Sequence, residues 1–185
     1  MNFFVNIRKY FGERVLRKMR PGNSGTSEII SFEHARNIGV LYSITQKNRH
    51  DNLIELLPSM LPLAENISFL CWNKSKRETP AGSGVVSVAS FNAKDIKWNM
   101  IPDNEQVRKF IAEPFDLLLV PDDPSLFPVR YITVMSKAKC KAGTWREQKA
   151  PIFDFMLDKA EENDFYEFCV QMKTMLKMFY GNNIK

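Results

Sequence analysis

The chain has 185 residues, of which 44% are hydrophobic and 25% are charged. This composition excludes a disordered or collagen-like chain and suffices for one hydrophobic core. No apolar run approaches the ~18 to 20 residues that a membrane-spanning helix needs, and the N-terminus lacks the apolar centre of a secretory signal. We therefore expect a cytoplasmic protein without a transmembrane segment.

The positive charge is confined to the first twenty residues. They hold six Lys or Arg residues and one acid, Glu13, which accounts for the whole formal net charge of +5. The rest of the chain is neutral, whereas a uniformly basic domain would favour nucleic acid more strongly. The six basic residues are Arg8, Lys9, Arg14, Arg17, Lys18 and Arg20.

The N-terminal segment predicts a helix followed by a linker. Within residues 2–20, apolar residues recur every three or four positions, which is the helical period. Residues 21–27 are turn formers, so we expect 21–36 to be a flexible linker and 37–185 to be a single domain. The apolar stripe of this helical arm is Phe4, Ile7, Phe11, Val15 and Met19.

Short apolar runs then alternate with stretches of helical periodicity. The near-continuous apolarity of the first run suggests a strand buried on both faces. Pro58 and Pro62 must kink or divide the first helix. The predicted strands are 38–44, 67–72, 85–91, 115–120, 139–143 (a short strand or strand edge) and 152–156, and the predicted helices are 51–64, 104–112, 127–138 and 164–180, the last lying on the sheet.

This alternation predicts a three-layer, Rossmann-like α/β domain, with a mainly parallel sheet covered by helices on both faces and a basic N-terminal helix in addition. In such sheets, ligands bind at the carboxyl ends of the strands, near the point where the strand order reverses. A site is therefore expected among residues 43–46, 73–76 and 121–125.

Common chemical motifs are missing from the sequence. It has no Gly-Lys dipeptide for a P-loop, no Gly-x-Gly-x-x-Gly after the first strand and no Gly-x-Ser-x-Gly elbow. His34 and His50 are too far apart for a close zinc-ligand pair. Cys71, Cys140 and Cys169 form no Cys-x-x-Cys pair and are expected to be small buried hydrophobes. We predict no cofactor and no metal.

Asp122 and Asp123 are the best acidic candidates for a site. They follow a buried strand, where a carboxylate could serve as a general base or a metal ligand. The sequence Pro-Asp-Asp-Pro is also typical of a turn followed by the start of a helix, because Asp is favoured in turns and at helix N-caps and Pro is favoured at the first helical position. Both interpretations stay open.

The basic helix has three interpretations. It could pack on its own domain or on a second copy in a homodimer. Its six cations could contact RNA or the ribosome, or it could lie on an anionic membrane surface with its phenylalanines in the interface. In the last two cases the binding residues would be Arg8, Lys9, Arg14, Arg17, Lys18 and Arg20.

The segment 115–143 carries a resemblance. Phe-Asp-Leu-Leu-Leu-Val, an amphipathic helix and Ser-Lys-Ala-Lys-Cys-Lys-Ala-Gly, together with Ile-Gly-Val at 38–40 after a basic leader, resemble a small uncharacterised bacterial family, a domain of unknown function. The same segment is similar to the N-terminal half of heptosyltransferase-type glycosyltransferases. The donor nucleotide of those enzymes is held mainly by the second half, so we do not expect a complete glycosyltransferase here.

The sequence thus favours a non-catalytic binding or assembly module whose basic arm contacts a partner surface. The alternative is a small-molecule transferase or hydrolase, acting on a sugar- or nucleotide-type substrate near Asp122 and Asp123. The sequence leaves open whether the protein is an enzyme.

Overall fold

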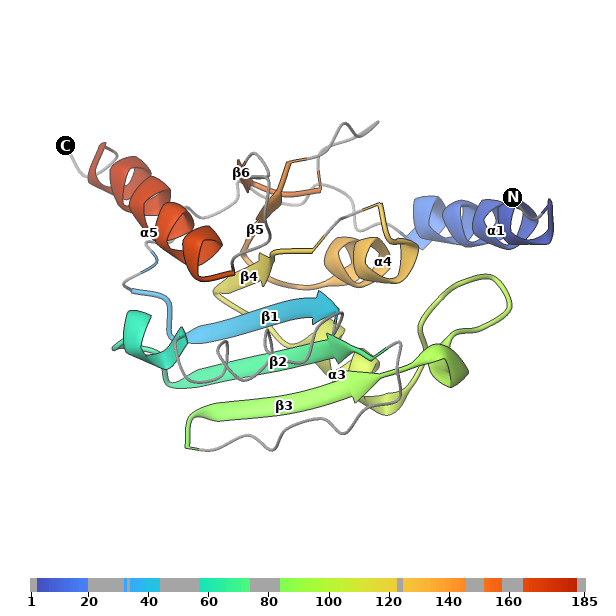
Figure 1. Ribbon diagram of the computed structural model, residues 1–185, viewed down its shortest axis with the longest axis horizontal. Helices are drawn as coiled ribbons and strands as arrows, with labels where there is room; N and C mark the ends of the chain where they lie inside the picture. The colour runs from blue at the N-terminus through green and yellow to red at the C-terminus, as the bar shows by residue number, and fades with distance from the viewer. Residues whose placement is uncertain are drawn as a thin grey trace.

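The computed structural model describes residues 3–19, 32, 34–43, 57–73, 84–122, 125–145, 152–157 and 165–182. Helices and strands alternate along most of the chain (Figure 1). The helices are α1 (Phe3–Met19), the short 3-10 helix η1 (Ala93–Asp95), α3 (Glu105–Ala112), α4 (Phe127–Met135) and α5 (Phe165–Asn182). The strands are β1 (Asn37–Ser43), β2 (Asn66–Trp72), β3 (Val86–Phe91), β4 (Leu117–Val120), β5 (Cys140–Thr144) and β6 (Phe155–Leu157).

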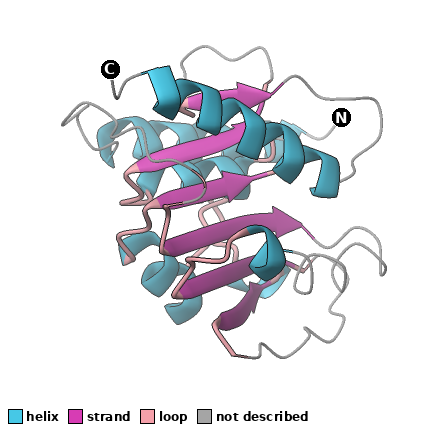
Figure 2. Cartoon of the chain, turned by 90° about the vertical axis from the view of Figure 1, so that its left-hand side faces the viewer, coloured by secondary structure: helices cyan, strands magenta, loops and turns pink. Residues whose placement is uncertain are grey.

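The six strands form one parallel sheet in the order β3-β2-β1-β4-β5-β6. All arrows point the same way in Figure 2. The order reverses between β1 and β4, which is the arrangement of the doubly wound Rossmann fold. The predicted three-layer, Rossmann-like architecture is therefore confirmed.

Each face of the sheet has its own core, because successive strand residues point to opposite faces. One core joins alternate residues of the strands, such as Val40 and Leu119, to α5 and a helical turn at 57–60. The other joins the intervening residues, such as Leu41 and Leu118, to α3, α4 and Leu16 of α1. Figure 2 shows α5 in front of the sheet and other helices behind it. The predicted packing of the last helix on the sheet is confirmed.

Several predicted boundaries differ from the structure. In the predicted helix 51–64, residues 51–56 lie outside the described part, and the helical turn ends at Met60 because Pro62 disfavours helical geometry in the residue before it. Helix α4 ends at Met135 and not at Ala138, since Lys137 N–H already donates to the Ile111 carbonyl oxygen at 3.2 Å.

The end of the sheet also differs from prediction. Strand β5 is the short strand that was one of the two predicted alternatives, and it lies between β4 and β6. Strand β6 is shorter than predicted, since Asp154 lies before its first residue and its carboxylate accepts the Lys141 N–H of β5 at 2.7 Å. Phe32 and Ala35, inside the predicted linker, are buried in the core, so the chain joins the domain before residue 37.

Candidate functional site

The first candidate site is the carboxyl edge of the sheet at the β1–β4 junction. The ladder between these strands pairs Ile38–Val40 with Leu117–Leu119 and goes no further. Beyond it, the backbone N–H of Ser43, the last residue of β1, donates a hydrogen bond to the Asp122 carboxylate. Where strands β1 and β4 diverge, the side chain of Asp122 therefore accepts the hydrogen bond that the backbone of a paired strand would accept.

Asp122 also connects to the next strand. Its backbone carbonyl accepts a hydrogen bond from the hydroxyl of Thr144, the last residue of β5, at 3.0 Å. Asp122 is only 7% exposed, and Ser43 and Thr144 are buried as well. One aspartate thus ties the carboxyl ends of β1, β4 and β5 together, as a structural turn residue would.

Cys71 lies near this cluster, at the carboxyl end of β2. Burial raises the pKa of its thiol far above the ordinary value, and the negative charge of Asp122 raises it further. The thiol is therefore protonated, whereas a nucleophilic cysteine needs the thiolate. Cys71, Cys140 and Cys169 are all buried, in agreement with the sequence prediction.

The charge of Asp122 also bears on ligands. Doubly wound proteins bind their ligands at the point of strand reversal, and dinucleotide-binding members hold phosphate there with glycine-rich backbone. A carboxylate in that position repels phosphate, and β1 leads into no such glycine motif. The geometry at Asp122 does not favour a nucleotide.

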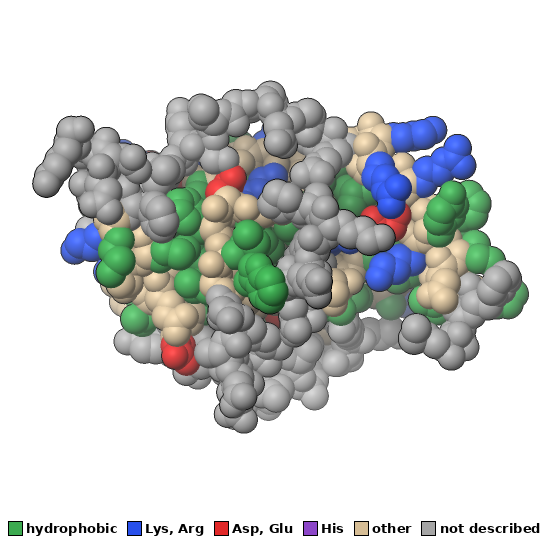
Figure 3. Space-filling model, turned by 90° about the horizontal axis from the view of Figure 1, so that it is seen from above, with side chains coloured by type: hydrophobic (Ala, Val, Ile, Leu, Met, Phe, Trp, Pro, Cys, Tyr) green, Lys and Arg blue, Asp and Glu red, His purple; other side chains and the backbone are tan. Residues whose placement is uncertain are grey.

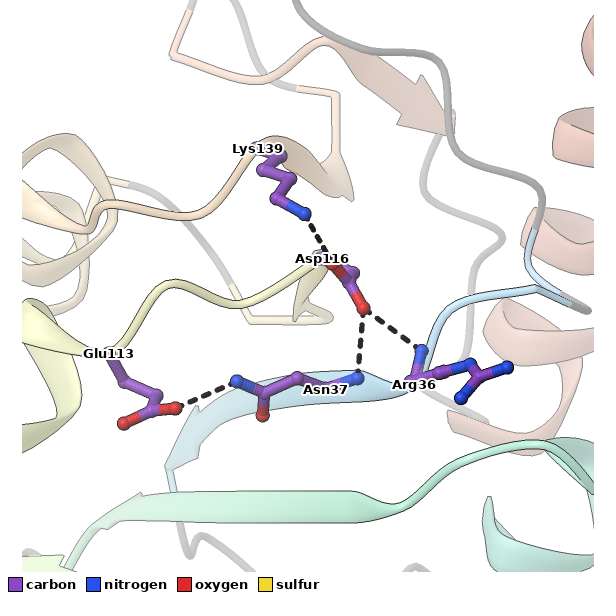
Figure 4. Close-up of polar contacts among 5 residues, drawn as sticks. All are labelled: Arg36, Asn37, Glu113, Asp116 and Lys139. Carbon is purple, nitrogen blue, oxygen red and sulfur yellow. Dashed lines mark hydrogen bonds and ion pairs between the residues drawn. The ribbon is translucent and has the colours of Figure 1, made fainter.

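A second aspartate, Asp116, connects neighbouring strands at the opposite edge of the sheet, where the strands begin (Figure 4). It directly precedes β4, and one carboxylate oxygen accepts the backbone N–H groups of Arg36 and Asn37, each at 3.0 Å, at the start of β1. The other oxygen accepts the ammonium of Lys139, before β5, at 2.8 Å. The Asn37 side chain donates to Glu113 at 2.7 Å.

The pKa of Asp116 reflects these contacts. Burial acts to raise the pKa of its carboxyl, but the hydrogen bonds from Lys139, Asn37 and Arg36 outweigh it and hold the pKa below its ordinary value. Strand β4 is thus held by an aspartate at each end, and each contacts β1 and β5. The sequence analysis missed Asp116; the signal was an aspartate on either side of the apolar Leu117–Val120 run.

The other sequence candidates do not gather at either edge. Asp123 and His50 lie outside the described residues, and so do the loop positions 44–46 and 74–76. Asn73 directly follows β2, and its backbone N–H donates to the Phe91 carbonyl at 2.8 Å. Among the residues that the structure describes, no three His, Cys, Asp or Glu side chains are grouped as a metal ion would require.

The second candidate site is helix α1, which packs against α4 and the turn at residues 97–99 (Figure 1). Gly12 allows the close approach, because a Cβ atom there would collide with the Asn99 carbonyl oxygen and come within 2.7 Å of the Phe127 ring. Leu16, one turn later, is buried in the core beside α4. We call this side of α1, with Arg8 and Glu13, the docked face.

Two charged groups fix the docked face. The Arg8 guanidinium donates to the carbonyl of Trp98 at 2.5 Å and to that of Lys97 at 3.4 Å. Glu13, the one acid of α1, forms an ion pair with Arg130 of α4, and both side chains are about three-quarters buried. The Arg130 guanidinium also lies 5.7 Å from the centre of the Phe127 ring.

The turn that receives α1 is itself braced. Met100 has a left-handed backbone (φ 68°), which is uncommon outside glycine, and its N–H donates to the Lys97 carbonyl at 2.9 Å. The Lys97 ammonium pairs with Asp103 at 2.5 Å, and Arg108 of α3 pairs with the same carboxylate. Carbonyls of three successive residues, 97 to 99, therefore face α1 from a rigid support.

The apolar stripe, which predicted the helix, is only in part the face that packs on the domain. Phe4 is 77% exposed, and Phe11 and Met19 are exposed as well, while Leu16, which the stripe left out, is buried. The packing is decided by Gly12 and by hydrogen bonds to backbone carbonyls, neither of which contributes to an apolar pattern. The predicted helix itself is confirmed.

The basic residues of α1 divide into two groups. Arg8 contacts its own domain, and Arg20 lies outside the described residues. The other four are exposed and form no ion pair with any described residue; we call them the outer cations: Lys9, Arg14, Arg17 and Lys18. Figure 3 shows Lys and Arg side chains gathered with hydrophobic ones at the α1 end of the molecule.

Comparison with known proteins identifies a family. Residues 8–179 match the model of a family of unknown function, DUF6913, so the match begins within α1 and includes all six strands. No curated protein and no solved structure matches the chain, and the likeness to heptosyltransferases stays a prediction. None of the described helices has the length and apolarity to cross a membrane. The chain belongs to the DUF6913 family of unknown function.

Proposed function

We propose that the protein is a non-catalytic binding module that uses α1 to hold an anionic partner surface. The observation that carries this proposal is the division of α1 into two sides. Its docked face is fixed by Arg8, Gly12, Glu13 and Leu16, and the outer cations are exposed to solvent. Because the helix is already ordered, binding would not require it to fold first.

The charge balance supports the same proposal. Outside the first twenty residues the chain is neutral, so the field of the protein is concentrated at α1. Each contact to a fixed anion releases counterions, which makes the binding weaken steeply with salt. An enzymatic function at the carboxyl edge has less support, because the contacts of Asp122 with Ser43 and Thr144 account for that aspartate without a ligand.

Retention of the whole protein on immobilised heparin, a polyanion, tests the proposal. A quadruple variant replaces the outer cations with Gln. A control variant removes the same charge from exposed lysines elsewhere: Lys94, Lys109, Lys137 and Lys177. We expect the α1 variant to elute at clearly lower salt than the wild type and the control to elute close to the wild type. Equal loss of retention in both variants would mean that net charge, not α1, binds the polyanion, and the proposal would fail.

A further inference from the structure

Helix α1 carries exposed apolar side chains beside its outer cations. Of the large hydrophobic residues that are exposed in the described part of the chain, six lie on α1 or against it. Phe4 and Tyr10 are 77% and 63% exposed, and Trp98, at 62%, lies 5.2 Å from the Phe11 ring, centre to centre. The six are Phe4, Val5, Tyr10, Phe11, Met19 and Trp98. Exposed apolar groups that gather in this way mark an interaction surface.

Two of these apolar residues, Phe4 and Phe11, lie on one flank of the helix, which we call the apolar flank. Phe4, Ile7, Phe11, Arg14 and Lys18 are spaced by three and four residues, so they form one line along α1, apolar in its first half and cationic in its second. Trp98 extends the apolar half through its contact with Phe11. Arg8 contacts the carbonyl oxygens of Lys97 and Trp98, and Phe4 and Val5 lie about one helical turn before it.

We propose that the anionic surface held by α1 is that of a lipid bilayer, with the apolar flank entering the headgroup region; this rests on the proposed function above. Helices that lie in the membrane interface carry Lys and Arg residues beside Phe and Trp residues. Each cation near an anionic membrane strengthens binding about fivefold. Single-stranded nucleic acid would use the cations and stack on aromatic rings, but Ile7, on the same line of α1 as Phe4 and Phe11, has no ring to stack.

Sedimentation with lipid vesicles tests this inference. The whole protein is mixed with phosphatidylcholine vesicles, with the same vesicles containing phosphatidylserine, and with a single-stranded RNA homopolymer. We expect binding to the phosphatidylserine vesicles, lost at high salt and in the quadruple outer-cation variant. Binding to RNA but not to vesicles would overturn the lipid inference and leave the proposed function standing. Binding to neither would overturn both.

A matched pair of variants isolates the apolar contribution. Phe4→Ser with Val5→Ser removes two exposed apolar side chains from α1, and Val170→Ser with Met178→Ser removes two from α5. We expect the α1 pair to weaken vesicle binding roughly tenfold and the α5 pair to leave it unchanged. Equal binding by both pairs would show that Phe4, the most exposed side chain of the apolar flank, does not enter the bilayer, and would overturn the inference.

Tryptophan fluorescence identifies the part of the protein that contacts the membrane. Lipids brominated near the headgroup quench a tryptophan that reaches the interface, and the exposed Trp98 and Trp145 give a matched comparison. We expect quenching of the wild type and of Trp145→Phe, and its loss in Trp98→Phe. Quenching that persists in Trp98→Phe would place another part of the protein at the membrane and would contradict the inference.

Discussion

Gly12 of α1 faces the carbonyl oxygen of Asn99 so closely that a Cβ atom at position 12 would collide with it. This contact holds α1 on its domain, beside the Phe127 ring of α4. The basic N-terminal segment is therefore a helix packed on the fold. The residues that contact the domain determine which side of this helix faces solvent.

Replacing Gly12 with Ala tests the docking. In an exposed helix this change stabilises by about 0.5–1 kcal/mol, because Gly loses more backbone freedom on folding. Here the added methyl group collides with a backbone carbonyl and an aromatic ring, so we expect a loss of about 1–3 kcal/mol. Urea unfolding measures the sign. Asn6→Ala, at an exposed position of the same helix, is the control and should cause no such loss.

The ion pair between Glu13 and Arg130 should show coupling in a double-mutant cycle. Glu13→Gln leaves a guanidinium that is largely buried against Phe127, and burial already lowers the pKa of Arg130. We expect a single-variant loss of about 1–3 kcal/mol and a smaller loss when Arg130→Met is added, measured by thermal unfolding. Additive losses would mean that the two side chains do not interact in solution.

Asp122 should act through its hydrogen bonds and not through its charge. Asp122→Ala leaves the buried Ser43 N–H without its acceptor, which costs about 1–3 kcal/mol. Asp122→Asn keeps an oxygen that can accept the same N–H, so we expect a clearly smaller loss in urea unfolding. If the two variants lose equal stability, the charge matters and the structural interpretation of this aspartate is wrong.

Asp116 should contribute stability that depends on pH. Its folded-state pKa lies below the ordinary value of 3.8, so its contribution is complete above that pH and is lost as the pH falls through the folded-state pKa. The wild type should therefore exceed Asp116→Asn by about 1 kcal/mol at neutral pH, and the difference should shrink in acid. A difference that stays constant from neutral pH down to about pH 2 would contradict this assignment.

The sequence was informative where apolar residues decide the structure. The continuous apolarity of Leu117–Val120 predicted a buried parallel strand, and the helical period after Asp164 predicted α5. It was not informative where packing depends on backbone. Gly12 carries no apolar signal, so the apolar pattern could not point to it as the residue that allows α1 to pack on the domain.

The candidate site was predicted in part. The position after β4 was expected to lie at the carboxyl edge, and Asp122 does lie there, next to Ser43. Asp116 was missed, because its partners at Asn37 and Lys139 are far away in the sequence and become neighbours only through the strand order. Pairing between distant strands is the information that local patterns lack.

Hydrogen–deuterium exchange on the whole protein tests the central claim, that α1 is docked on the domain with its cations outward. The measurement compares the amides of α1 in the protein alone and with phosphatidylserine vesicles. We predict slow exchange from Arg8 to Leu16 in the protein alone, faster exchange in Gly12→Ala, and added protection near Phe4 only with vesicles. Exchange of α1 at the rate of an unfolded peptide in the protein alone would contradict the account.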